Sequence, residues 1–287
     1  MDIGVFYFPT DYSFELTELA IELEQRGFES LMVCEHTHIP ASRRSEWPGG
    51  GELPKEYYHT YDPFVGLSFA AGVTKKLKIG TSICLVPQHD PFNLAKSVAS
   101  LDRLSGGRFV FGIGGGWNED EMENHGIEYK SRFRVLSETI LAAKQMWTEE
   151  KAEYHGEFVD FDPVFSSPKP IQKPHPPILL GGQSDHTLRR VVEFCDGWIP
   201  VGPLDMTGGM ARLRRVADEA GRDMATLSTT VFQMATLTKM VLQTTESDEA
   251  ALQGYAEVGV NRVLMQMPTA DRDSCLKTLD GFMPLLG

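Results

Sequence analysis

The chain of 287 residues carries a formal net charge of -13, with 41% hydrophobic and 23% charged residues. That composition is typical of a globular protein with a sizeable core. The acidic balance argues against nucleic acid or an anionic membrane as a partner, because basic patches supply the affinity for both. No apolar window reaches the ~18 residues of a membrane span, and the amino-terminal segment lacks the basic and apolar regions of a signal peptide.

Short β-like runs alternate with helical segments through the first half of the chain. Apolar strands are predicted at 2–8, 30–36, 76–86 and 108–116, and helices at 13–27, 62–74, 91–107 and around 132–148. The first helix repeats apolar residues at Leu16, Leu19, Ala20 and Leu23, and Gly27 is placed to end it. Asp62–Pro63 and Asp90–Pro91 have the residue types that begin helices.

The pattern breaks at residues 151–177, which contain a Gly-centred hairpin signal and six of the 17 prolines. It resumes with strands at 177–182, 197–202, 227–237 and 262–267 and helices at 184–195, 207–220, 247–257 and 272–285. Eight strand–helix units predict an α/β fold, a (β/α)8 TIM barrel with an insertion after the fourth strand–helix unit. The chain 1–287 is expected to form a single domain, and a doubly wound open sheet is the alternative fold.

The cysteines, Cys34, Cys84, Cys195 and Cys275, stand far apart and form no C-x-x-C pair. We expect reduced thiols in a cytoplasmic protein, with a disulfide framework or a zinc site as the alternatives.

A barrel places its site at the carboxyl ends of the strands. Those ends are Phe8-Pro9, Glu35-His36, 85–90, 114–121, 181–185 and Val201-Gly202. The loop at 37–61 contains Trp47, three consecutive glycines and several tyrosines. Its length predicts a lid over the substrate, and a floppy insertion is the alternative.

His36 is the candidate catalytic residue, because histidine can donate or accept a proton near neutral pH and the adjacent Glu35 can orient it. A hydrogen-bonded structural histidine is the alternative. His36, His38 and Glu35 have a spacing that can bind zinc, but no further ligand is identifiable and we assign no metal site.

Two glycine-rich stretches follow strands. GGQSDHTLRR (181–190) predicts a phosphate site at a helix amino-terminus, with a tight turn and a Ser184 cap as the alternative. In GRFVFGIGGGWNEDE (107–121), Trp117 occupies the place of the third glycine of a dinucleotide fingerprint. This stretch therefore predicts a strand and a glycine loop that lets a cofactor lie close to the backbone.

Three segments together resemble the bacterial luciferase-like monooxygenase superfamily. LDRLSGGRFVFGIGGGWNEDE (101–121) is similar to its signature, a helix and the fourth strand followed by G-x-G-x-G-W-x-x-x-E, and KLKIGTSICLVPQHDPFNLAK (76–96) is similar to the preceding unit. Residues 155–190, followed by DGWIP, resemble the branch that depends on coenzyme F-420. The resemblance spans about 2–267.

The resemblance implies an enzyme with a flavin or 5-deazaflavin in the barrel mouth, and often a homodimer. In the family, the third strand often contains a non-prolyl cis peptide, which matches Ser82–Ile83, and the histidine matching His36 contributes to catalysis in several members. The implied cofactor contacts are Thr81, Ser82, Ile83, Gly114, Gly115, Gly116, Trp117, Asn118, Gly181, Gly182, Gln183 and Ser184.

Gly115 departs from the family pattern, because the luciferase proper has a phosphate-binding arginine there and some deazaflavin members have a catalytic glutamate. Glu35 or Glu119 could substitute for that glutamate. The function predicted is an F-420-dependent oxidoreductase that transfers hydride to or from a small organic substrate. The alternatives are an FMN-dependent two-component monooxygenase and a flavin-binding barrel without catalysis.

Overall fold

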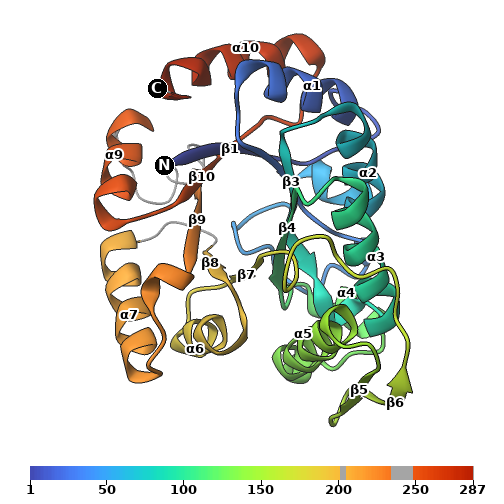
Figure 1. Cartoon of the computed structure of the whole chain (residues 1–287). Coiled ribbons are helices and arrows are strands. Elements are labelled where there is room, and N and C mark those ends of the chain that lie inside the picture. Colours follow the sequence, from blue (N-terminus) through green and yellow to red (C-terminus); the bar gives the residue numbers. More distant parts are fainter. Residues whose placement is uncertain (201–204, 234–247, 287) are drawn as a thin grey trace.

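Eight parallel strands close into a barrel in this computed structural model, which describes residues 1–200, 205–233 and 248–286 (Figure 1). In order around the barrel the strands are β1 (Asp2–Tyr7), β2 (Ser30–Val33), β3 (Lys78–Leu85), β4 (Phe109–Gly114), β7 (Ile178–Gly181), β8 (Gly197–Ile199), β9 (Ser228–Gln233) and β10 (Arg262–Gln266). β10 pairs with β1 in register from Asp2 opposite Arg262, so the two ends of the chain close the barrel. The predicted TIM barrel is therefore confirmed.

Helices surround the strands on the outside (Figure 1). They are α1 (Leu16–Arg26), α2 (Pro63–Val73), α3 (Pro91–Leu104), α4 (Glu119–Asn124), α5 (Arg132–Thr148), α6 (Asp185–Phe194), α7 (Met206–Glu219), α9 (Asp248–Val258) and α10 (Arg272–Phe282). The predicted Asp62 cap is in place, since its side chain accepts from the Val65 N–H, and the structure adds a cap at Asp90, which accepts from the Asn93 N–H. Such caps contribute about 1 kcal/mol each.

Several predicted strands end earlier in the structure than in the sequence analysis. The second ends at Val33 rather than residue 36, and the fourth ends at Gly114 rather than residue 116. The residues after these ends leave the barrel and form loops at its mouth. The predicted strand end Val201-Gly202 and residues 234–237 of the seventh predicted strand lie outside the described residues.

The predicted insertion is an antiparallel hairpin of β5 (Ala152–His155) and β6 (Asp160–Val164), which lies beside α5 at the edge of the molecule (Figure 1). The Glu138 carboxylate of α5 accepts the N–H groups of residues Glu157, Phe158 and Val159 at 3.2, 2.7 and 3.0 Å. The hairpin turn is thereby fastened to the helix.

The core has two layers. A small cluster fills the barrel interior with Phe6, Phe8, Met32, Cys34, Val110, Leu179, Ile199, Phe232 and Leu264. A larger cluster packs the outward-facing strand residues against the helices. Strands buried on both faces explain the continuous apolar runs in the sequence. The four cysteines are free and buried.

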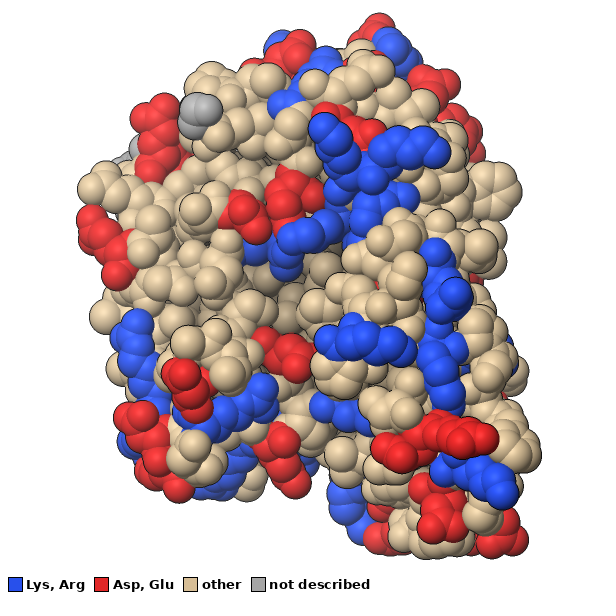
Figure 2. Space-filling model, in the orientation of Figure 1, with Lys and Arg blue, Asp and Glu red and all other residues tan. Residues whose placement is uncertain are grey.

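Acidic and basic side chains lie next to one another over the face of the molecule in Figure 2. Within the described residues, no helix combines the length and apolarity needed to cross a membrane.

Candidate active site

A cavity of about 630 Å³ opens at the carboxyl ends of the barrel strands. This volume lies in the usual range for small-molecule sites. Of the predicted site residues, its lining includes Glu35, His36, Ser82, Ile83, Gly114, Gly115, Gly116, Trp117, Gly181 and Gly182. Thr81, Asn118, Gln183 and Ser184 lie outside the lining. The structure thus brings most of the predicted site residues to one cavity and leaves four of them outside its lining.

His36 forms a buried pair with Glu121, the last residue of the G-x-G-x-G-W-x-x-x-E signature. Its Nδ1 lies 2.8 Å from Glu121 Oε2, and the two side chains are 6% and 0% exposed. No partner for His36 Nε2 is found in the described part of the chain, and the ring lines the cavity. The carboxylate thus orients the imidazole, and the second ring nitrogen can exchange a proton with a ligand.

Glu35 is the other predicted catalytic residue, and its carboxylate is hydrogen-bonded within the protein. Its oxygens accept the Leu85 N–H at 2.5 Å and contact His89 Nε2 at 2.8 Å. Burial alone raises the pKa of Glu35, but the hydrogen bond and charge of His89 outweigh it and the pKa lies below its ordinary value. Burial lowers the pKa of His89, and the bond from Glu35 raises it overall. Glu35 therefore holds the end of β3, and its side chain also belongs to the lining of the cavity.

Glu119, the second suggested substitute, is exposed on the first turn of α4 and does not line the cavity. The partner of His36 is two residues further on, at Glu121. The signature motif contains this glutamate, and its position was the available signal for it.

The zinc ligands considered from sequence diverge. His36 pairs with Glu121, His38 contacts Thr37 and Asn124, and Glu35 contacts His89. Among the described residues, the group with ligand atoms close enough for a metal is Glu35, Cys84 and His89, within 4.8 Å of one another. Hydrogen bonding between Glu35 and His89 accounts for that group.

Aromatic rings from the predicted lid form one wall of the cavity. Tyr57 packs on His36 with ring centroids 5.2 Å apart and on Phe8 at 4.8 Å, and Trp117 approaches His36 edge-on at 5.8 Å. Trp47 lies next to Tyr57 at 6.1 Å. Burial raises the pKa of Tyr57 to about 12, which keeps its hydroxyl protonated. The 37–61 loop thus reaches the cavity.

The bond between Ser82 and Ile83 is cis, as the resemblance implied. The Ser82 hydroxyl is buried at the cavity and has no partner among the described residues, which fits a polar group of a ligand. Thr81 instead turns away, since its hydroxyl donates to the Gly112 carbonyl at 2.7 Å.

Glycines of β4 and β7 lie in close contact with β3. A Cβ on Gly114 would lie 2.2 Å from Ile83 Cδ1, and one on Gly181 would lie 2.9 Å from the same atom. A Cβ on Gly112 would lie 2.1 Å from the Thr81 carbonyl oxygen. These three glycines therefore accommodate β3 at close approach, and Gly114 and Gly181 also line the cavity.

The predicted phosphate region lies at the amino-terminus of α6. Ser184 caps this helix, its hydroxyl accepting the Thr187 N–H at 3.1 Å, while the Gly182 carbonyl accepts the Trp198 indole N–H at 2.6 Å. The cap and an anion site are compatible, since further backbone N–H groups of the first turn face the loop.

Two arginines that the sequence analysis missed flank this region. The guanidinium groups of Arg132 and Arg190 stack on Phe133, 4.6 and 5.0 Å from its ring centre. The Phe133 ring lines the cavity and packs on Gly115, where a Cβ would lie 3.0 Å from it. Among the described residues, no carboxylate lies within 4.0 Å of either guanidinium. Arg132 donates to the Tyr129 carbonyl at 2.8 Å and Arg190 to the His186 carbonyl at 3.2 Å, while Arg132 Nε is buried without a partner.

A further segment without a sequence signal is the turn after β10, where Gln266, Met267, Pro268 and Thr269 line the cavity. Their position beside β1 follows from barrel closure and not from any local pattern.

The chain resembles known proteins over almost its whole length. A family model described as luciferase-like monooxygenase matches residues 9–276. The uncharacterized protein Rv0953c of Mycobacterium tuberculosis is 36% identical over 278 residues, which cover 95% of this chain and 94% of that protein.

Two solved structures with bound cofactors share the fold. An F420-dependent secondary alcohol dehydrogenase with an F420-acetone adduct has a TM-score of 0.75 at 17% identity and covers 99% of this chain and 98% of its own. The oxygenating constituent of 3,6-diketocamphane monooxygenase of Pseudomonas putida, in complex with FMN, has a TM-score of 0.60 at 19% identity, with 80% and 66% covered. From the family match and the 36% identical relative, the chain belongs to the luciferase-like monooxygenase family and is an oxidoreductase of that family.

Proposed function

We propose that the protein is a coenzyme F-420-dependent oxidoreductase that moves a hydride between the deazaflavin and a small organic substrate. The observation that carries the proposal is the His36–Glu121 pair in the wall of the cavity, with 2.8 Å between Nδ1 and Oε2. The carboxylate of Glu35 is occupied by Leu85 and His89, so we assign the proton exchange to His36. Hydride transfer to or from an oxygen-bearing carbon needs such a group.

The residues that would hold the cofactor form two groups. Ser82, Gly115 and Gly116 would contact the ring system, since they line the cavity and the Ser82 hydroxyl has no other partner among the described residues. Arg132 and Arg190, with the amino-terminus of α6, would bind the phosphate. When bound, the deazaflavin supplies hydride chemistry at carbon five of its ring and does not readily activate oxygen.

The chain's own residues then provide orientation and a proton path. Glu121 positions the His36 ring, and Tyr57 and Trp117 pack on that ring and exclude water. His36 Nε2 donates or accepts the substrate proton as the hydride moves. His36 is thus the proposed catalytic residue and Glu121 a positioning residue.

The alternative is an FMN-dependent two-component monooxygenase. Arg132 and Arg190 favour it, because they supply the cations that Gly115 does not. The resemblance of residues 155–190 to the F-420 branch favours the deazaflavin.

Titration of the purified protein with F-420 and with FMN, followed by fluorescence, distinguishes the two. Micromolar binding of F-420 without binding of FMN is the expected result. Binding of FMN alone would replace the proposal by the monooxygenase, and binding of neither would overturn both cofactor assignments.

His36→Ala should retain F-420 binding and lose about 100-fold or more of turnover with a panel of small alcohols and ketones. Glu121→Gln should reduce turnover by about tenfold or more and alter the pH profile, since the imidazole loses its orienting carboxylate. Glu119→Gln is the matched control and should leave both unchanged, because Glu119 is exposed two residues away. Unchanged turnover in His36→Ala would refute the catalytic role.

The proposal includes a homodimer, a single domain over 1–287 and a cytoplasmic location. α2 has an outward apolar stripe of Val65, Phe69 and Val73, which are 59%, 66% and 44% exposed. A second copy that packs on this stripe would bury it. Phe69→Lys should convert a dimer into a monomer in size-exclusion chromatography with light scattering, and a monomeric wild type would contradict the inference.

A further inference from the structure

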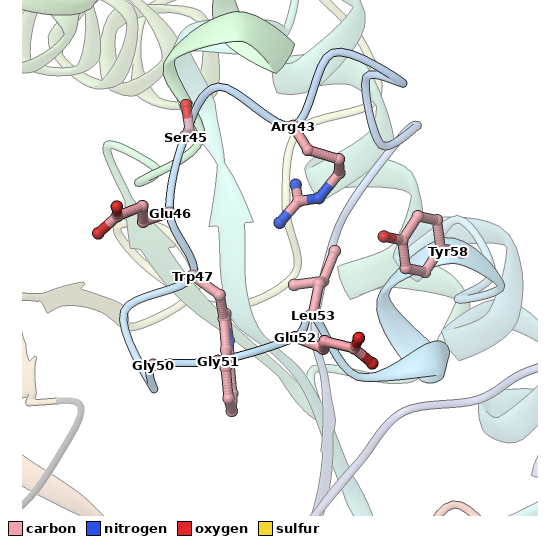
Figure 3. A pocket seen from close by; sticks show the side chains of 9 residues that line it. All are labelled: Arg43, Ser45, Glu46, Trp47, Gly50, Gly51, Glu52, Leu53 and Tyr58. Carbon is pink, nitrogen blue, oxygen red and sulfur yellow. The ribbon is translucent and has the colours of Figure 1, made fainter.

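We propose that the loop after β2 holds a second binding site, which takes the carboxylate at the far end of the substrate. This rests on the proposed function in one respect, because the ligand is the substrate that reacts at His36. The site is a cavity of about 610 Å³ with Arg43, Trp47, Leu53 and Tyr58 in its lining (Figure 3).

Among the described residues, no ion-pair partner of the Arg43 guanidinium is found. Its NH1 nitrogen is buried without a hydrogen-bond acceptor, and no carboxylate lies within 4.0 Å of it in the described part of the chain. The neighbouring Arg44 differs, since it forms ion pairs with Glu123 and Asp120. A buried cationic donor without an acceptor is costly, so the position suits an anionic ligand.

The backbone holds Arg43 in an unusual conformation. Its φ of 46° is the positive value of a non-glycine residue, and no other such residue occurs among the described ones. Left-handed conformations of non-glycine residues are unfavourable and concentrate at ligand sites. Figure 3 shows the resulting direction, with the guanidinium pointing into the space bounded by Trp47, Leu53 and Tyr58.

Asp120 of α4 fixes the backbone on both sides of Arg43. Its carboxylate accepts from the Ser42 hydroxyl, from the Arg44 N–H at 3.3 Å and from the Ser45 hydroxyl at 2.7 Å. Burial opposes its charge, but these hydrogen bonds lower the pKa of Asp120 to about 2. The arginine is therefore presented by a rigid segment, as a binding site requires.

Trp47 connects this cavity to the one at His36, because it lines both. Gly49 lies flat against the indole, where a Cβ would approach the ring to 2.4 Å. On its other side Trp47 packs on Tyr57, which packs on His36 at 5.2 Å. A ligand that reaches both sites has an apolar or aromatic middle along this wall.

Two glutamates restrict the charge of the ligand. Glu46 and Glu52 also line the cavity, both are exposed, and Glu46 points away from Arg43 in Figure 3. Their charges disfavour polyanions, while Arg43 favours one anionic group in direct contact. The structure thus selects substrates with a single carboxylate remote from the reacting carbon.

Calorimetric titration of the full chain without cofactor tests this assignment. The probes are phenylacetate, 4-phenylbutyrate and 6-phenylhexanoate, each compared with its primary amide. At least one carboxylate should bind about tenfold or more tightly than its amide. Arg43→Gln should abolish the difference, whereas Arg44→Gln, with the same change of charge one residue away, should preserve it.

Equal affinities of acids and amides, no binding of the acids, or equal effects of the two variants would overturn the proposal. Matching thermal unfolding of both variants excludes misfolding as the cause of a loss. F-420 binding to Arg43→Gln should equal that of the wild type. Failure of the carboxylate site and failure of the cofactor assignment therefore give different results.

Discussion

Glu35→Gln should destabilise the barrel and leave F-420 binding unchanged, because the carboxylate is a structural group behind His36. The side chain is 2% exposed and accepts from Leu85 N–H at 2.5 Å and contacts His89 at 2.8 Å. A hydrogen bond to a buried charge contributes about 1.5–3 kcal/mol. Glutamine keeps an acceptor for Leu85 but loses the charge, so we expect a loss of about 2 kcal/mol and a Tm lower by about 4–8 °C.

A double-mutant cycle that combines Glu35→Gln with His89→Gln measures the interaction energy between these two side chains. The folded pKa of Glu35 is lowered, so its contribution is complete above the ordinary value of 4.5 and is lost as the pH falls through the folded pKa. The folded pKa of His89 is raised, so its contribution is complete below 6.5 and is lost as the pH rises through the folded pKa. Urea unfolding should therefore give a larger coupling energy near pH 5.5 than near pH 9.

The reasoning would be refuted by additive effects of the two substitutions at both pH values. It would also be refuted if Glu35→Gln left Tm unchanged while abolishing turnover, since a catalytic and not a structural role would then apply.

Two further stability predictions concern the barrel strands. Gly112→Ala should destabilise by about 1–3 kcal/mol in urea unfolding, because the new Cβ meets the Thr81 carbonyl oxygen at 2.1 Å and β3 must move away from β4. Gly72→Ala is the matched control on α2 and should stabilise by about 0.5–1 kcal/mol, since nothing lies within 4 Å of its Cβ. Glu29 contacts Arg262 at 2.6 Å, and although burial raises its pKa, that partner lowers it to about 2. Its contribution is lost as the pH falls from 4.5 toward 2, so the wild type should lose more stability than Glu29→Gln over that interval, and parallel curves would contradict the assignment.

Much of the fold was predictable because burial produces a recognisable hydrophobic pattern in the local sequence. Strands covered on both faces read as apolar runs, and helices against a sheet repeat every three or four residues. The capping aspartates Asp62 and Asp90 and the glycine after α1 also act within a few residues of themselves. The order of the strand–helix units then leaves few ways to close the sheet.

The site was predictable only in its location. The ends of parallel strands meet at one face, so His36, Trp117 and Gly181 reach a common cavity. The sequence did not reveal which carboxylate contacts His36. The adjacent Glu35 contacts His89 instead, and the partner of His36 is Glu121, 85 residues away in the chain. The same holds for Gly114, whose missing side chain makes room for Ile83 of another strand.

The local periodicity of the sequence was thus enough to predict the barrel and the position of its mouth. The roles proposed for Glu35, Glu121, Arg132 and Arg43 depend on the directions in which their side chains point. Those directions result from packing between segments distant in the chain, as when α4 anchors Ser42 and Ser45 and so aims Arg43 into its cavity. The spacing of residues along the chain does not reveal such contacts. They become visible only in the tertiary structure.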